Sequence, residues 1–360
     1  MTRARQNANV SAAVGRNMVI NGSMNVAQRA TSVTGIGSSG GYITCDRWNI
    51  ASGNTAGRFT MSQTADGPNG ISANCIKLDC TTADSSIAAS ENLVLQQKFE
   101  GQNLQRIGKG VAGAKQITLS FYVKASAAFT FGVELRDRDN DRQITKLYDT
   151  TTDWVRHEFT FPADVDDGSS PFDDDNASSL ELRFWLHAGS SFAGGTLNTA
   201  AFANTTTANR AAGIDSFFSN TDNNWFITGV QMEIGPVATE FEQEDITTTI
   251  AKCQRYFLST GGEAAFERFA VGANESATRA SALFYYPTTM RAVPSLATSG
   301  TTTVFAGGAL TATNATSIAN ASTKVASVIF DVGSGLTTGQ GAILLSNNDS
   351  DTRVQYDAEL

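Results

Sequence analysis

Alternation of apolar and polar residues is the main pattern in this chain, and it is clearest in residues 223–241. Every second residue there falls on the same side of an extended backbone, and a period of two predicts a β-strand. Gly235 and Pro236 then end the strand, because proline lacks the N–H that a sheet requires. We interpret it as the last strand of a first domain. One predicted face carries Phe226, Thr228, Val230, Met232 and Ile234, and the other carries Trp225, Ile227, Gly229, Gln231 and Glu233.

Four more segments between residues 115 and 190 alternate in the same way. Strands with one apolar face, joined by polar loops, are typical of an antiparallel sandwich. No long amphipathic helix separates them, which argues against parallel βαβ units. About eight such strands fit a jelly roll. The four apolar rows consist of Ile117, Leu119, Phe121 and Val123; Phe129, Phe131, Val133 and Leu135; Val155, His157, Phe159 and Phe161; and Leu180, Leu182, Phe184 and Leu186.

A single helix is predicted after this first domain. Asp245 would cap its first turn, and Ile246, Ile250, Cys253 and Phe257 would share one face. After the helix, short apolar runs are set in glycine, threonine, serine and asparagine. The predicted fold class is therefore all-β. We expect an N-terminal arm over 1–16, an antiparallel jelly-roll β-sandwich over 17–245, a linker helix over 246–257 and a second, smaller C-terminal β-sandwich over 258–360.

Composition and charge narrow the classes of partner. Of the 360 residues, 41% are hydrophobic and 17% are charged, which is typical of a soluble globular protein. The net charge of -9 argues against a nucleic-acid partner, since phosphate binding requires a basic surface and Arg3 with Arg5 is too small a group to form one. The apolar runs are too short for a membrane helix, and the N-terminus lacks the apolar region of a secretory signal. We expect neither nucleic-acid binding nor membrane insertion.

The cysteines and histidines limit the chemistry that the chain can carry. The four cysteines have the spacing of neither a zinc site nor a disulfide framework, so we expect free, mostly buried thiols in a reducing compartment. Only two histidines are present, which leaves little for a Ser–His hydrolase or a histidine-based metal centre. His157 lies in an apolar row and is interpreted as a core or edge residue rather than a catalytic one. The chain is expected not to be an enzyme.

One strand carries a candidate ligand-binding face. Arg183, Trp185 and His187 lie opposite the apolar row of residues 180–186, together with Glu181. A flat apolar ring beside hydrogen-bonding groups is what a sugar site needs, so these three residues are candidates for glycan binding. The alternative is that this face packs against a loop or another subunit. The small, polar segment 189–213 follows directly and is longer than a typical connection.

An acidic segment over 164–176 is a candidate calcium site. Its oxygen donors would be Asp164, Asp166, Asp173 and Asp175, because calcium takes six to eight oxygen ligands. The segment departs from the EF-hand pattern, with Gly168 at the fifth position and no bidentate glutamate. The alternative is a solvated acidic loop without any ion. No other cofactor is expected.

An ordered set of motifs covers most of residues 17–257, and a weaker pair follows. The motifs are NMVINGSMNVAQRAT at 17–31, CDRW at 45–48, LQQKFEGQNL at 95–104, TLSFYVKAS at 118–126, SLELRFWLHAGS at 179–190, NNWFITGVQMEIGPVATEFE at 223–242 and KCQRYF at 252–257, then YYPTTMRAVPSL at 285–296 and the terminal DAEL. In this order they resemble a family of bacteriophage tail-fibre and virion structural proteins, especially those of marine phages. The resemblance implies a jelly-roll domain similar to carbohydrate-binding modules and a homo-oligomer, usually a trimer. It implies no known ligand residues.

The expected function is that of a bacteriophage virion structural protein, a tail fibre or tail-associated component that displays β-sandwiches for host-surface attachment. Its partners would be its own copies in a homotrimer, other tail or capsid proteins and a host surface glycan. It would be assembled in the host cytoplasm and would reside in the virion. One alternative is a capsid decoration or head-fibre protein. A second is a polysaccharide depolymerase, against which stand the absence of a β-helix repeat and of a convergent acid–base cluster.

Overall fold

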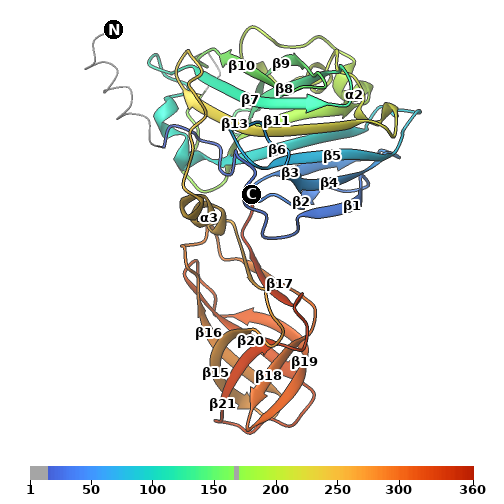
Figure 1. Cartoon of the computed structure of the whole chain (residues 1–360). Helices are drawn as coiled ribbons and strands as arrows, with labels where there is room; N and C mark the ends of the chain where they lie inside the picture. Colours follow the sequence, from blue (N-terminus) through green and yellow to red (C-terminus); the bar gives the residue numbers. More distant parts are fainter. Residues whose placement is uncertain (1–14, 166–169) are drawn as a thin grey trace. The chain divides into compact units, whose positions relative to one another are not determined.

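The computed structural model describes residues 15–165 and 170–360 (Figure 1). The chain forms two compact units, one ending at Thr249 and one comprising Ile250–Glu359. Strands make up nearly all of the regular structure, and all the strand pairs are antiparallel, so the predicted all-β fold class is confirmed. Most of the arm predicted over 1–16 lies outside the described residues. No helix in the described part of the chain is long and apolar enough to cross a membrane.

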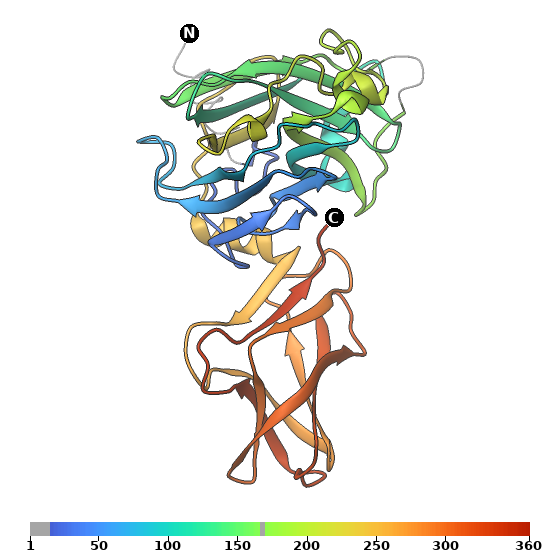
Figure 2. The same ribbon diagram turned by 90° about the vertical axis from the view of Figure 1, so that its right-hand side faces the viewer.

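The first unit is a sandwich of two sheets (Figure 2). The six-stranded sheet has the order β1 (Ser32–Ile36), β4 (Arg58–Thr64), β5 (Cys75–Thr82), β13 (Asn224–Ile234), β7 (Ile117–Ala125) and β10 (Val155–Phe161). The seven-stranded sheet has the order β12 (Ala203–Asn204), β9 (Arg142–Asp149), β8 (Thr130–Asp137), β11 (Ser178–Ala188), β6 (Asn92–Glu100), β3 (Asn49–Gly53) and β2 (Gly41–Tyr42).

The core of this sandwich is made by the predicted apolar rows. Phe121 of β7 and Phe184 of β11 are both fully buried and meet edge to face, with ring centroids 5.0 Å apart. Trp225 of β13 lies 6.1 Å from the same Phe184 ring. Because β7 and β13 belong to one sheet and β11 to the other, these rings join the two layers.

Strand β13 departs from the simple alternation that its sequence predicts. Its pairing with β7 shifts register between Thr228 and Gln231, and Gly229 there has φ +60°. A bulge of this kind adds one residue, so the faces exchange beyond it. The core consequently receives Trp225, Ile227, Val230 and Met232, which are all fully buried. The prediction that Phe226 and Val230 share one face is therefore wrong.

A turn at Asn21 and Gly22 lies against this bulged part of β13. The amide of Val230 donates to the carbonyl oxygen of Gly22 at 3.0 Å, and the amide of Met18 donates to that of Met232 at 2.8 Å. Gly22 has little space here, since a Cβ atom would lie 2.1 Å from the Val230 oxygen. The motif beginning at Asn17 thus completes the sheet where the bulge interrupts it.

The second unit contains nine strands in two groups. The strands β14 (Phe257–Gly261), β22 (Arg353–Asp357) and β17 (Ser295–Ser299) form a three-stranded sheet. The closed barrel has the order β15 (Arg268–Ser276), β16 (Arg279–Tyr285), β20 (Val325–Val332), β19 (Ala309–Ala319), β18 (Thr302–Ala306) and β21 (Gly341–Ser346). The expected second, smaller sandwich thus takes the form of a barrel with a sheet beside it. Closure pairs β15 with β21 and leaves no open edge in the barrel.

The helical elements within residues 15–165 and 170–360 are short. They are the 3₁₀ turns η1 (Gly101–Asn103), η2 (Gln105–Ile107), η3 (Thr207–Asn209) and η4 (Phe217–Ser219), and the α-helices α2 (Ser190–Ala193) and α3 (Ile246–Gln254). Asp245 caps α3 by accepting from the amide of Thr247 at 2.9 Å, as its position predicts. The helix ends at Gln254, and Phe257 begins β14. Since Ile246 is 46% exposed, the predicted stripe is not buried as a whole.

Candidate functional site

The predicted glycan-binding face of β11 is buried. Trp185 is fully buried, and its indole N–H donates to Glu134 of β8 at 2.8 Å. The guanidinium groups of Arg183 and Arg210 lie 5.3 and 5.0 Å from the centroid of the indole ring. Arginine at these distances from an aromatic face makes a favourable cation–π contact.

Glu134 is the centre of the charge network on this face. Arg210 donates to its two carboxylate oxygens at 2.8 and 2.9 Å, and Arg183 lies 3.3 Å away as a second ion pair. Arg183 also donates to Glu181 at 2.8 Å. Burial alone would raise the pKa of Glu181, but the charge and the hydrogen bond of Arg183, together with the charges of two neighbouring arginines, outweigh it, so the pKa lies below its usual value. These groups satisfy one another rather than facing solvent.

The segment that follows β11 covers this network. Phe192 of α2 lies 5.3 Å from the Trp185 ring, and Ala211 and Ile214 complete the apolar cover. Arg210 belongs to the same segment. The alternative considered for this face, packing against a loop, is therefore what the structure contains. That Arg183, Trp185 and His187 bind a glycan stays a prediction, and it requires residues 189–214 to move away.

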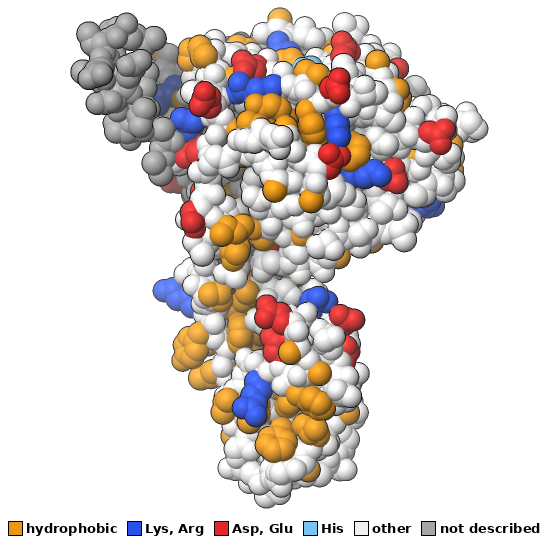
Figure 3. All heavy atoms as spheres, in the orientation of Figure 1, with side chains coloured by type: hydrophobic (Ala, Val, Ile, Leu, Met, Phe, Trp, Pro, Cys, Tyr) orange, Lys and Arg blue, Asp and Glu red, His pale blue; other side chains and the backbone are white. Residues whose placement is uncertain are grey.

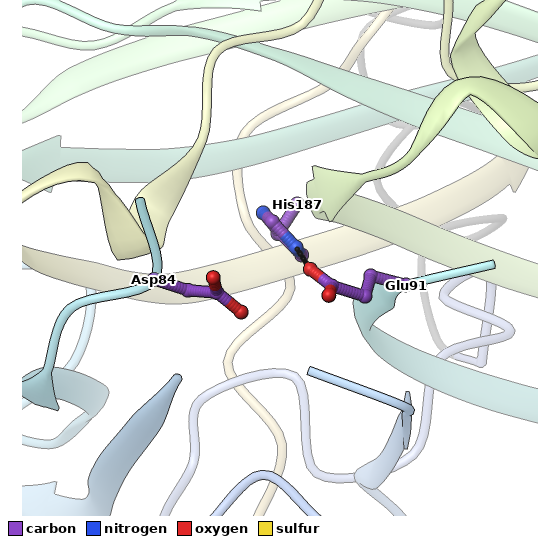
Figure 4. Close-up of side chains that lie close together, drawn as sticks. All are labelled: Asp84, Glu91 and His187. Carbon is purple, nitrogen blue, oxygen red and sulfur yellow. Dashed lines mark hydrogen bonds and ion pairs between the residues drawn. The ribbon is translucent and has the colours of Figure 1, made fainter. Parts of the chain in front are cut away.

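His187 takes part in a different cluster at the end of the sandwich (Figure 4). Its Nε2 lies 3.1 Å from a carboxylate oxygen of Glu91, and its Nδ1 lies 2.8 Å from the hydroxyl of Ser216. Asp84 completes the group, and one donor atom from each of Asp84, Glu91 and His187 lies within 4.8 Å of the others. Three donors from separate segments thus converge, and all three residues are buried.

Sequence spacing gives no indication of this cluster. Glu91 and His187 are 96 positions apart, and Ser216 is a further 29 positions along the chain. Asp84 lies in the loop after β5 and Glu91 lies just before β6. The order Ser–His–Glu is also that of hydrolase triads, but the Ser216 hydroxyl accepts from the amide of Phe218 and caps η4. That bond gives the hydroxyl a structural role.

The acidic segment predicted to hold calcium is only partly described. Asp164 is buried and accepts from Arg142 through both oxygens, at 2.8 and 2.9 Å, with Lys109 at 3.8 Å. Asp173 and Asp175 are exposed, and Asp166 lies outside the described residues. A carboxylate already held by two cations is a poor calcium ligand. Calcium binding at this segment stays a prediction, but Asp164 is engaged elsewhere.

His157, the second histidine, stacks in parallel with Phe159 at a centroid distance of 6.0 Å. Its Nε2 lies 2.8 Å from the backbone oxygen of Asp149. Burial lowers its pKa below the usual value, in spite of this hydrogen bond. These contacts agree with its interpretation as a packing residue.

A hollow of about 150 Å³ lies on the outside of the barrel in the second unit. Cross-strand pairing aligns Ile343 of β21, Phe305 of β18 and Leu310 of β19 in one row. The hollow is lined by Phe266, Arg268, Phe305, Leu310, Ile343 and Leu345. Phe266 is 43% exposed and Phe305 is 36% exposed, so both rings are open to solvent. Apolar side chains gather on the barrel surface in Figure 3.

No pattern in the sequence predicts this hollow. Its strands are rich in threonine and alanine, and the apolar residues that line it come from four separate segments of the chain. The one signal available was a phenylalanine at an outward position of an alternating strand, TTVFA at Thr302–Ala306. Only the closed barrel brings Phe305 beside Arg268 and Phe266.

Comparisons with known proteins give similarity in structure only. No protein-family model matches the sequence, and no curated protein does. The phage family that the motifs resemble is thus not shown by these comparisons.

The solved structures similar to this chain include several carbohydrate-binding modules. A structure described as CBM4 has a TM-score of 0.30 at 13% identity, with coverage of 59% of this chain and 97% of that one. TmCBM61 in complex with β-1,4-galactotriose has a TM-score of 0.30 at 10% identity, covering 61% and 99%. The tandem CBM22 domain of Paenibacillus barcinonensis Xyn10C has a TM-score of 0.27 at 11% identity, with coverage of 93% of this chain and 98% of that one. These values are too low to carry a function from those proteins to this chain.

Proposed function

We propose that this chain is a non-enzymatic bacteriophage virion structural protein, a tail fibre or tail-associated component that attaches to a carbohydrate on the host surface. The observation that carries the binding role is the barrel hollow, where two open phenyl rings lie beside a guanidinium group. The ordered motifs over residues 17–257 support the virion role. A homotrimer is part of the proposal.

The chemistry of the hollow suits a sugar. The apolar face of a pyranose ring packs on an aromatic ring such as Phe305 or Phe266, and Arg268 offers N–H donors to hydroxyl or carboxylate oxygens. Ligand pockets usually measure roughly 300–1,000 Å³, so a hollow of about 150 Å³ suits one sugar unit and weak binding. A trimer would raise the apparent affinity by presenting three linked copies.

Three buried carboxylates of the first unit are held in ion pairs. Glu134, Glu181 and Asp164 all accept from arginine and are not free to act as general acids or bases. This favours an attachment protein over a polysaccharide depolymerase. A capsid decoration protein of the same fold is the second candidate, which immunogold electron microscopy of intact particles would distinguish by its position on the head.

Ligand-detected NMR on the full chain tests the binding role, with a panel of neutral and acidic monosaccharides as probes. Phe305→Ala and Arg268→Gln should each weaken binding at least about tenfold, because they remove the stacking ring and the donor group. Leu283→Ala is the matched control, since Leu283 of β16 is 59% exposed and does not line the hollow. The proposal is overturned if no sugar in the panel binds, or if both variants bind like the control.

Light scattering should give the mass of a trimer.

A further inference from the structure

The cluster of Asp84, Glu91 and His187 has the geometry of a metal centre. Two ligands of a tetrahedral zinc ion, each about 2.0–2.1 Å from the metal, lie roughly 3.3 Å from one another. The distance of 3.1 Å between His187 Nε2 and the Glu91 oxygen is close to that value. The Asp84 carboxylate lies within 4.8 Å of both, so a small side-chain adjustment brings the third ligand into range (Figure 4).

The cluster also lacks the positive charge that other buried carboxylates have. Among the described residues, no lysine or arginine nitrogen lies within the 4.0 Å ion-pair distance of Asp84 or Glu91, which are only 5% and 4% exposed. Four other buried carboxylates of this unit are paired: Glu134 with Arg210, Asp137 with Lys109, Asp164 with Arg142 and Glu181 with Arg183. Buried charges are normally paired or bound to a metal.

Outer contacts hold two of the three side chains, His187 and Asp84, in position. The Ser216 hydroxyl is hydrogen-bonded to Nδ1 of His187, which leaves Nε2 directed at Glu91. The Thr55 hydroxyl and the Ala56 amide donate to one oxygen of Asp84, at 2.9 and 2.8 Å. Metal-binding histidines and carboxylates are usually oriented by a second set of hydrogen bonds of this kind.

We propose that Asp84, Glu91 and His187 bind one divalent transition-metal ion of the Zn²⁺ type. An imidazole nitrogen with two carboxylates suits zinc and related ions, whereas calcium takes oxygen ligands alone. The ion joins the two layers of the sandwich, because Asp84 follows β5 of one sheet, while Glu91 directly precedes β6 and His187 lies in β11 of the other sheet. Its role is structural, since the donors are buried and lie in the first unit, apart from the barrel hollow.

The chain's two histidines allow a direct test without any substitution. Chelator-treated full-length protein, labelled with ¹⁵N in its histidine rings, is titrated with ZnCl₂. One equivalent should shift the ring nitrogens of one histidine and raise the melting temperature, while the ring of His157 stays unchanged. No ring shift at a tenfold excess of Zn²⁺ overturns the proposal.

Two variants identify the ligands. Glu91→Gln keeps the size of the side chain but removes a charged ligand, and it should weaken Zn²⁺ binding at least about tenfold. His157→Gln is the matched control and should bind like the original chain. Binding that Glu91→Gln leaves unchanged overturns the proposal, whatever the stability of the variant.

Cobalt separates this site from the cysteines. Co²⁺ bound by nitrogen and oxygen ligands should give only weak visible bands, whereas thiolate ligation adds an intense near-ultraviolet band. All four cysteines are buried and free, and burial raises the pKa of Cys80 to about 11, which disfavours the thiolate. A thiolate band at one equivalent would assign the ion to cysteine and overturn the proposal.

Discussion

Replacing Glu134 by glutamine tests the energetics of the covered face of β11. Glu134 is fully buried and accepts three hydrogen bonds, two from Arg210 and one from Trp185. Glutamine has nearly the same shape but no charge, and its NH₂ group would face a guanidinium donor. Each hydrogen bond to a charged group contributes about 1.5–3 kcal/mol, and breaking a buried ion pair costs about 3–5 kcal/mol. We therefore expect Glu134→Gln to lower the free energy of unfolding by about 3–5 kcal/mol.

Asp66→Asn is the matched control, because it is the same chemical change at the surface. Asp66 pairs with Lys124 at 2.8 Å, but its side chain is 53% exposed. Exposed pairs contribute about 0–1 kcal/mol, so this variant should be nearly as stable as the original chain.

Urea unfolding followed by tryptophan fluorescence measures both variants in the first unit alone. All four tryptophans, Trp48, Trp154, Trp185 and Trp225, lie before Thr249. A loss of 3 kcal/mol corresponds to roughly a hundredfold change in the unfolding equilibrium. A difference of less than about 1 kcal/mol between the two variants would contradict the stabilising role of the buried ion pair. A double-mutant cycle with Arg210→Gln that gives no coupling would contradict it too, since coupled buried pairs show about 0.5–3 kcal/mol.

Three further predictions concern packing and titration. Burial lowers the pKa of His157 below 6.5, so the unfolded chain binds more protons than the folded chain. The free energy of unfolding should therefore fall as pH decreases from 7.5 through 6.5. A His157→Phe variant whose urea midpoint keeps the full pH dependence would contradict this. Gly22→Ala should cost about 1–3 kcal/mol, because its Cβ would meet the Val230 oxygen at 2.1 Å, whereas Gly113→Ala has open space and should be neutral in the same urea assay. The four buried thiols should react with a thiol reagent only after unfolding, and fast labelling of the native chain would disprove their burial.

The local pattern of the chain was enough to predict its strands and most of its core. Leu119 and Phe121 of β7 and Leu182 and Phe184 of β11 are all fully buried, as their alternation requires. The expectation of free, buried cysteines is also confirmed. These properties depend on neighbours along the chain and on the transfer of apolar side chains out of water, so one sequence contains the information.

The candidate site depends on contacts that no local pattern records. Alternation shows that Trp185 is opposite the core, but not that residues 189–214 fold back over it and carry Arg210 to Glu134. The alternation of residues likewise does not predict the extra residue at Gly229, which exchanges the two faces of β13. A bulge and a covering segment are chosen by the packing of distant parts of the chain.

The metal-binding cluster and the barrel hollow are the clearest products of tertiary structure. Glu91 and His187 meet across 96 positions, and Phe305 lies beside Arg268 only because six strands close into a barrel. The alternating pattern determines which side of a strand is apolar, because burial depends on side-chain chemistry. Which polar groups meet at the end of a sandwich is decided by strand order and register, since these set the distances between residues far apart in the sequence.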